Sequence, residues 1–140
     1  MGGKIIRGSI VVLSAFVALT AIPSAFLVVP ALPAEWLRSG PFTDYTIPAI
    51  ALGAVGVIAA ITAVAIVSVP RLGALAAIGT GIAMAAFEVV EVFIVGFALT
   101  LYPDMVQSWL QPIYFAIGLA IAALGLALYR EGEPRLTLAA

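Results

Sequence analysis

Glu88 and Glu91 are the residues of this sequence best placed to do chemistry. No other charged residue occurs between Arg71 and Asp104, so both carboxyl groups lie deep in a long apolar stretch. Three positions apart on a helix, they share one face, which must turn towards a protein interior or a wet cavity. Because ionisable residues inside membranes are functional by default, this spacing predicts a site for a proton, a cation or a small ligand.

The charge state of this pair follows from the cost of burying it. An ionised acid at the centre of a membrane helix costs about 2.5 to 3.5 kcal/mol, so two unpaired carboxylates would cost about 5 to 7 kcal/mol. Protonation, a cationic partner or a bound cation would each remove that cost. Because desolvation and mutual repulsion both oppose ionisation, we expect at least one of the two to be neutral at neutral pH.

Two other roles for the glutamates stay open. Arg38, on the loop after the first apolar stretch, could fold back over the bundle and pair with Glu91. Alternatively, the protonated acids could act as structural contacts that donate hydrogen bonds to a carbonyl freed near Pro23 or to the hydroxyl groups of Ser14, Thr20, Ser24 or Thr62.

Other polar residues are weaker candidates. Asp44 and Tyr45 could serve as a partner or gate for the glutamates, although capping of the following helix is the favoured interpretation. Three polar residues near the start of the fourth apolar stretch could line an entrance, but headgroup contact is favoured for them: Gln107, Ser108 and Gln111.

The residue types that are missing exclude several chemistries. The chain has no histidine and no cysteine, which removes the usual metal ligands, haem ligands and catalytic bases. Two carboxylates three residues apart on one helix are also an unusual arrangement for an aspartic-type mechanism. We therefore predict no metal, no cofactor and no enzymatic activity.

The elements that must position the glutamates are membrane helices. Hydrophobic residues make up 64% of the 140-residue chain and charged residues 9%, far from the soluble average. A bilayer core needs about 20 apolar residues in a helix, and four windows meet this length: 8–29, 47–69, 72–101 and 106–129. We predict an all-α fold, a polytopic four-helix transmembrane bundle forming a single membrane domain over 1–140, with an outer loop at 30–46 and a tail at 130–140.

The basic residues predict the orientation of this bundle. Placing both termini in the cytoplasm puts five of the six there, Lys4, Arg7, Arg71, Arg130 and Arg135, and leaves only Arg38 outside. Aromatic residues suit the outer interface in the same topology: Trp36, Phe42, Tyr45, Tyr102 and Trp109. The net charge of −1 gives no reason to expect nucleic acid, and no run of Lys and Arg resembles a lipid-headgroup patch.

Local sequence features predict how the helices meet. The link at 70–71 is so short that the second and third spans must form a helical hairpin, and Pro23 and Pro112 are expected to kink their helices. Small residues recur four apart, and packing inside one bundle is favoured over a dimer interface for them: Gly56 and Ala60, Gly73 and Ala77, Gly81 and Ala85, Gly118 and Ala122.

One resemblance rests on the outer segment Ser39-Gly40-Pro41-Phe42, the following 45–48 and the glutamates of the third span. In this pattern the chain resembles short four-span bacterial inner-membrane proteins. The resemblance implies a multi-pass protein of the bacterial plasma membrane, and it brings no activity with it.

Two functions follow as alternatives. In the first, the chain binds or translocates a proton, a cation or a small ligand at Glu88 and Glu91; transport by so small a chain would imply a homodimer. In the second, it is a noncatalytic accessory or assembly subunit of a larger membrane complex, whose glutamates dock against a basic residue of a partner helix.

Overall fold

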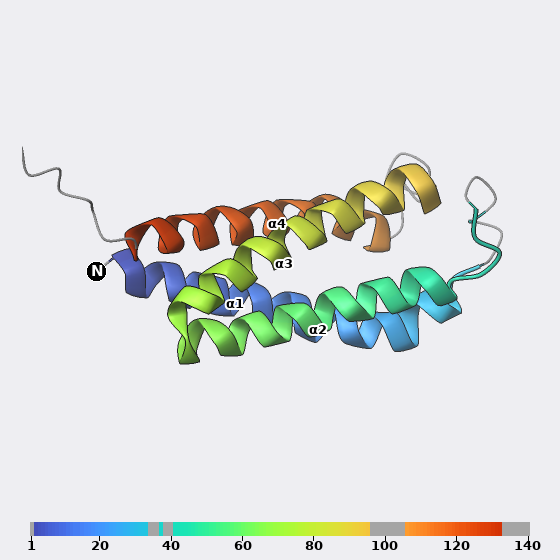
Figure 1. Ribbon diagram of the computed structural model, residues 1–140. Helices are drawn as coiled ribbons and strands as arrows, with labels where there is room; N and C mark the ends of the chain where they lie inside the picture. Colours follow the sequence, from blue (N-terminus) through green and yellow to red (C-terminus); the bar gives the residue numbers. More distant parts are fainter. Residues whose placement is uncertain (1, 34–36, 38–40, 96–105, 133–140) are drawn as a thin grey trace, which may run out of the picture.

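The architecture is that of a helical bundle, as predicted. The computed structural model describes residues 2–33, 37, 41–95 and 106–132 (Figure 1). Within these ranges every regular element is helical: α1 (Gly2–Pro23), π-helix η1 (Ser24–Val28), 3-10 helix η2 (Val29–Ala31), α2 (Thr46–Ser68), α3 (Pro70–Val90), π-helix η4 (Glu91–Val95) and α4 (Val106–Glu131).

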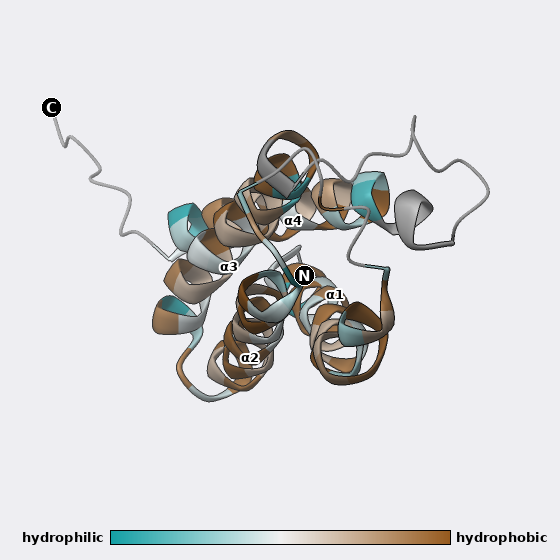
Figure 2. Cartoon of the chain, turned by 90° about the vertical axis from the view of Figure 1, so that its right-hand side faces the viewer, coloured by the Kyte–Doolittle hydropathy of each residue, from teal (hydrophilic) through white to brown (hydrophobic). Residues whose placement is uncertain are grey.

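The four long helices pack in a ring that follows chain order. Helix α1 packs on α2, α2 on α3, α3 on α4, and α4 returns to α1. The α3–α4 interface is the most extensive of these and the α1–α4 interface the least. Figures 1 and 2 show the resulting two pairs, α1 with α2 and α3 with α4, each of them antiparallel. This is the four-helix bundle that the apolar windows predict.

The outer surface of the bundle is apolar. Four segments are long and apolar enough to cross a membrane: Gly2–Ala31, Thr46–Ser68, Pro70–Phe93 and Gln111–Glu131. On each of them large apolar side chains are more than half exposed, for example Val12, Ile50, Leu72 and Leu119, and Figure 2 shows hydrophobic, brown segments on all four long helices. Lipid matches such a surface and water does not. The chain is therefore a multi-pass membrane protein.

One end of the bundle carries all the basic side chains within the described ranges, namely Lys4, Arg7, Arg71 and Arg130, and we call it the basic end. The start of α1 and the end of α4 meet there, because the Glu131 carboxyl lies beside Gly2 and Gly3. Both helix ends are thus on one side of the bundle, as four spans require. That this side is cytoplasmic remains a prediction from the distribution of Lys and Arg.

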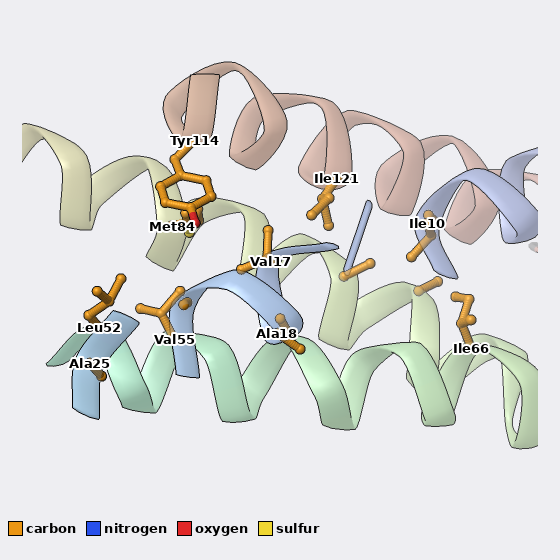
Figure 3. Close-up of a cluster of buried hydrophobic side chains, with 14 of the residues drawn as sticks. Ile10, Val17, Ala18, Ala25, Leu52, Val55, Ile66, Met84, Tyr114 and Ile121 are labelled. Atoms are coloured by element: carbon orange, nitrogen blue, oxygen red, sulfur yellow. The ribbon is translucent and has the colours of Figure 1, made fainter. Parts of the chain in front are cut away.

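The interior is filled by a continuous apolar cluster to which every long helix contributes. Figure 3 shows side chains of this cluster, including Val17, Val55, Met84 and Ile121, pointing inwards between the ribbons. Alanine is the commonest residue type at the buried positions, so the helix backbones lie close together.

Glycines make the closest helix contacts. A Cβ atom at Gly81 would overlap the α4 backbone at Gly118 and Ala122, and one at Gly118 would lie 3.0 Å from the backbone nitrogen of Ala85. Gly56 contacts Ile22 of α1 in the same manner. These small-residue faces therefore pack within one chain, the interpretation favoured from the sequence. A homodimer remains a prediction, and it would have to use another surface.

The turn between α2 and α3 confirms the predicted hairpin. A single residue, Val69, separates the two helices, and Pro70 occupies the first position of α3, where its missing N–H costs nothing. Gly73 faces α2 so closely that a Cβ atom would overlap the backbone of Ala65 and Ile66. The tight turn therefore depends on glycine one turn into α3.

Pro23 changes the type of helix. Helix α1 ends at Pro23, and the chain continues as the π-helix η1. Proline has no N–H to donate and its ring displaces the carbonyl of the preceding turn, so a wider helical register takes up the mismatch. Pro112 lies inside α4, which continues through it.

The α3–α4 contact yields a direct test of the packing. Replacing Gly81 by alanine forces α3 away from α4, and we expect a loss of about 1 to 3 kcal/mol of stability, the usual cost of overpacking. The matched control is Gly79→Ala on the same helix, where nothing lies within 4 Å of the added Cβ. Unfolding in mixed micelles should separate the two variants, and equal stabilities would contradict the observed α3–α4 contact.

Candidate functional site

Glu88 lies in the last turn of α3 and points into the bundle. Its side chain is 3% exposed, on the same face as buried Met84 and Ala85. Both carboxyl oxygens are buried, and neither makes a hydrogen bond of standard geometry to any residue in the described ranges. A buried carboxyl group without such bonds is costly in its ionised form.

Glu91 begins the π-helix η4, where the regular helix of α3 ends. Its backbone N–H is shared between the carbonyl groups of Phe87 and Glu88. The side chain is half-buried, and its carboxyl group interacts with the side chains of Glu88 and Gln111. Single π turns inside helices occur often at functional sites, because they redirect the side chains that follow.

The facing helix contributes a second pair of polar side chains at the same spacing. Gln111 and Tyr114 are both buried and lie three residues apart on α4. The glycine contacts define how α4 runs against α3: Gly81 meets Ala122, and Ala85 meets Gly118. Continuing this antiparallel register by one to two turns brings α4 residues 111–114 opposite α3 residues 88–91.

Tyr114 connects this site to the first helix. Its hydroxyl group donates a hydrogen bond to Oγ1 of Thr20 at 2.6 Å, and Thr20 donates in turn to the carbonyl oxygen of Phe16 at 2.7 Å. Figure 3 shows Tyr114 reaching from α4 into the interior beside Met84.

This hydrogen-bond direction leaves the Tyr114 oxygen able to accept. Its own proton is directed to Thr20, and the hydroxyl group is near enough to Glu88 and Glu91 for their charges to act on it. A tyrosine oxygen with available lone pairs can accept a hydrogen bond from a neutral carboxyl group or coordinate a cation. We call the set Glu88, Glu91, Gln111, Tyr114 and Thr20 the glutamate cluster.

Two of the four hydroxyl partners considered from the sequence are engaged elsewhere. Thr20 bonds to Tyr114, and Thr62 shares a 2.7 Å hydrogen bond with Thr80 that joins α2 to α3. Ser14 is buried and its oxygen has no hydrogen-bond partner among the described residues. Two of the contacts proposed for a purely structural role of the glutamates are thus used by other residues, and that role remains an alternative prediction.

Asp44 and Tyr45 occupy the loop that leads into α2. The N-cap position of α2 is Tyr45, and its side chain makes no capping hydrogen bond. The Asp44 carboxylate, one residue earlier, accepts the backbone N–H of Thr46, the first residue of α2, at 2.9 Å. Tyr45 is buried, and its hydroxyl group donates to the carbonyl oxygen of Pro33 at 3.3 Å. The first contact is local to the start of α2, and the second joins the two ends of the connection between η2 and α2. Arg38, the proposed partner of Glu91, lies outside the described residues.

Sequence reasoning assigned Gln111 to the headgroup region and overlooked Tyr114. The signal was present, since two polar side chains three residues apart on an apolar helix repeat the spacing of Glu88 and Glu91. The sequence does not show the register between α3 and α4, which brings the two pairs opposite each other. The side chains of Gln107 and Ser108 lie outside the described part of the chain.

The ligand chemistry of the cluster follows from its charges. Within the described ranges no group of three His, Cys, Asp or Glu residues lies together, and every basic side chain is at the basic end. Divalent cations prefer six or more oxygen ligands with several carboxylates. Two carboxyl groups flanked by an amide and a hydroxyl suit a proton or a monovalent cation better.

Comparisons with known proteins add no information about this site. Neither protein-family profiles, nor curated proteins, nor solved structures give a match to the chain.

The Tyr114–Thr20 bond can be measured by a double-mutant cycle with Tyr114→Phe and Thr20→Val. We expect a coupling free energy of about 0.6 kcal/mol, the average for hydrogen bonds between membrane helices. Tyr114→Phe combined with Thr62→Val is the control, because Thr62 bonds to Thr80 instead and distant changes add. A coupling as large in the control pair would show that the effect is not this bond.

The hydrogen bond between the Asp44 carboxylate and the Thr46 N–H predicts a pH dependence. The backbone N–H of Thr46 holds the pKa of Asp44 below its usual range. A group whose pKa is lower in the folded state stabilises above its unfolded pKa, and the stabilisation disappears as pH falls through the folded pKa. Asp44→Ala should therefore lower the unfolding temperature at neutral pH and have no effect in strong acid. A difference that persists unchanged at low pH would contradict this role.

Proposed function

We propose that this chain binds a proton, or a monovalent cation that competes with it, at the glutamate cluster, and carries it through the membrane. The observation behind the proposal is the Glu88 carboxyl group, which is buried inside an apolar bundle beside Glu91 and makes no hydrogen bond of standard geometry to a described residue. Such a pair is stable only when positive charge is added to it.

The neighbouring groups support exchange rather than permanent occupation. Gln111 can both donate and accept, and the Tyr114 oxygen can accept. Both groups can therefore contact the pair in its protonated and its cation-bound form. Glu91 is half-buried while Glu88 is fully buried, so a ligand would reach Glu91 first and Glu88 second.

An accessory role is the second candidate, and the exposure of Glu91 is the observation in its favour. A half-buried carboxyl group on a membrane helix could pair with a basic residue of another protein's helix. This role predicts that the chain is unstable when expressed alone, and that Glu91→Gln disturbs assembly. The proton or cation site predicts a stable isolated chain whose variants still assemble.

Infrared difference spectroscopy of the protein in lipid bilayers tests the binding site. Between about pH 4 and about pH 10 we expect a protonated carboxyl band that changes with pH and with added Na⁺ or K⁺ and that is altered in Glu88→Gln and Glu91→Gln. Glu131→Gln, an exposed acid at the basic end, should leave the band unchanged. A band that ignores both pH and cations would rule out the site.

Proton or cation flux into proteoliposomes tests transport separately. A charge-assisted contact is worth about 1.5 to 3 kcal/mol, so Glu88→Gln should slow flux by about tenfold or more. Glu131→Gln is again the control. Normal spectroscopic binding with no flux above empty liposomes would limit the function to binding.

A further inference from the structure

Tyr114 joins α4 to α1 across the least extensive of the four helix interfaces. Its hydroxyl group donates to Oγ1 of Thr20 at 2.6 Å, and the Phe16 ring packs beside its own ring with the centroids 6.3 Å apart. The Thr20 hydroxyl group directs its proton to backbone carbonyl oxygens of α1, at 2.7 Å for Phe16 and 3.3 Å for Val17. Each hydroxyl group has a single proton, so Tyr114 has to be the donor in the bond to Thr20.

An ionised glutamate would compete for the same tyrosine proton. The glycine contacts place Tyr114 opposite the turn from Glu88 to Glu91, and the charges of both glutamates act on Tyr114. The two oxygens of Glu88 make no hydrogen bond of standard geometry to a described residue, so they can accept one. Hydrogen bonds to an ionised acceptor are roughly twice as strong as those between neutral groups. A carboxylate would therefore displace the Thr20 hydroxyl group as the acceptor.

The charge that Tyr114 meets on the surrounding helices comes from these two glutamates. Helix α2 has no charged side chain, and the basic side chains of α1, α3 and α4 are at the basic end. Glu131, the acid of α4, also lies there, because its carboxyl group is beside the start of α1. Gln111 is a neutral amide at every pH. On the described helices, the charge near Tyr114 thus changes only with a proton or cation on the glutamate pair.

We propose that Tyr114 is a switch that couples the charge of the glutamate pair to the contact between α1 and α4. With a proton or a cation on the pair, Tyr114 donates to Thr20 and the two helices are joined. On the ionised, empty pair, the hydroxyl group turns to a carboxylate, the bond to Thr20 is lost and the least extensive interface loosens. The switch rests on the proposed function and adds a step to it. A ligand moves a protein between two conformations only by binding them unequally, and this bond supplies the inequality.

A double-mutant cycle with Tyr114→Phe and Thr20→Val at several pH values tests the switch. The unfolding free energies should show coupling below the pH at which the infrared carboxyl band titrates, and the coupling should be lost above that pH. The matched control is the cycle of Thr62→Val with Thr80→Val, a buried hydroxyl pair joined at 2.7 Å between α2 and α3. Its coupling should be equal at all pH values.

Spin-label distances in lipid bilayers test the change of packing. The chain has no cysteine, so labels can be attached to the exposed positions of α1 and α4 through Leu19→Cys and Ile113→Cys. We expect this distance to increase when the glutamate pair ionises. The distance from Ile82→Cys on α3 to Leu119→Cys on α4 should stay constant, because glycine contacts hold that interface. Adding Tyr114→Phe should remove the pH dependence of the first distance.

Each result decides the proposal. A carboxyl band that titrates while the Tyr114–Thr20 coupling and the α1–α4 distance stay constant overturns the switch and leaves the binding site intact. A band that never titrates overturns both, because the charge near Tyr114 would then be fixed. An increase in distance that persists in Tyr114→Phe, or equal loss of the Thr62–Thr80 coupling, also overturns the switch. A pH-dependent coupling and distance without flux across the membrane would support the switch and refute transport.

Discussion

The burial of two carboxyl groups in an apolar bundle is the constraint on which the rest of this structure depends. Glu88 is enclosed on a helix face whose other residues are small or apolar. In lipid there is no water to solvate it, so the protein has to supply polar neighbours or a positive charge. The neighbours are Glu91, Gln111 and Tyr114. Glu91 follows Glu88 by one helical turn, whereas Gln111 and Tyr114 belong to α4, so α4 must lie in the right register against α3.

The close packing of α3 on α4 makes this placement possible. Gly81 lies seven residues before Glu88, and Gly118 seven residues after Gln111, so each glycine shares a helix face with a polar residue of the cluster. The glycines allow the two backbones to approach. Two turns further along the same interface, the polar side chains of α3 and α4 therefore lie close to each other. The hydrogen bond from Tyr114 to Thr20 connects these two helices to α1.

Charge is separated along the bundle. The glutamate cluster occupies one half, and the basic side chains within the described residues occupy the opposite end. Within the described ranges, the basic side chains therefore lie away from the glutamates. At the basic end, Arg7 and Arg71 share a cavity with one another instead.

The sequence by itself determined the all-helical fold and the four spans, because hydrophobic length is a property of consecutive residues. Glu88 and Glu91 were predicted from it as the candidate site, because charges within an apolar stretch are visible in the sequence. It also predicted the α2–α3 hairpin, since so short a link allows no other arrangement. Only the tertiary structure decided which helix faces meet. Gln111 and Tyr114 beside the glutamates, and Arg7 in the lining of one cavity with Arg71, depend on the register between helices distant in sequence. That register comes from the contacts of small residues such as Gly81 and Gly118 across the interface, and no local pattern specifies which pair will touch.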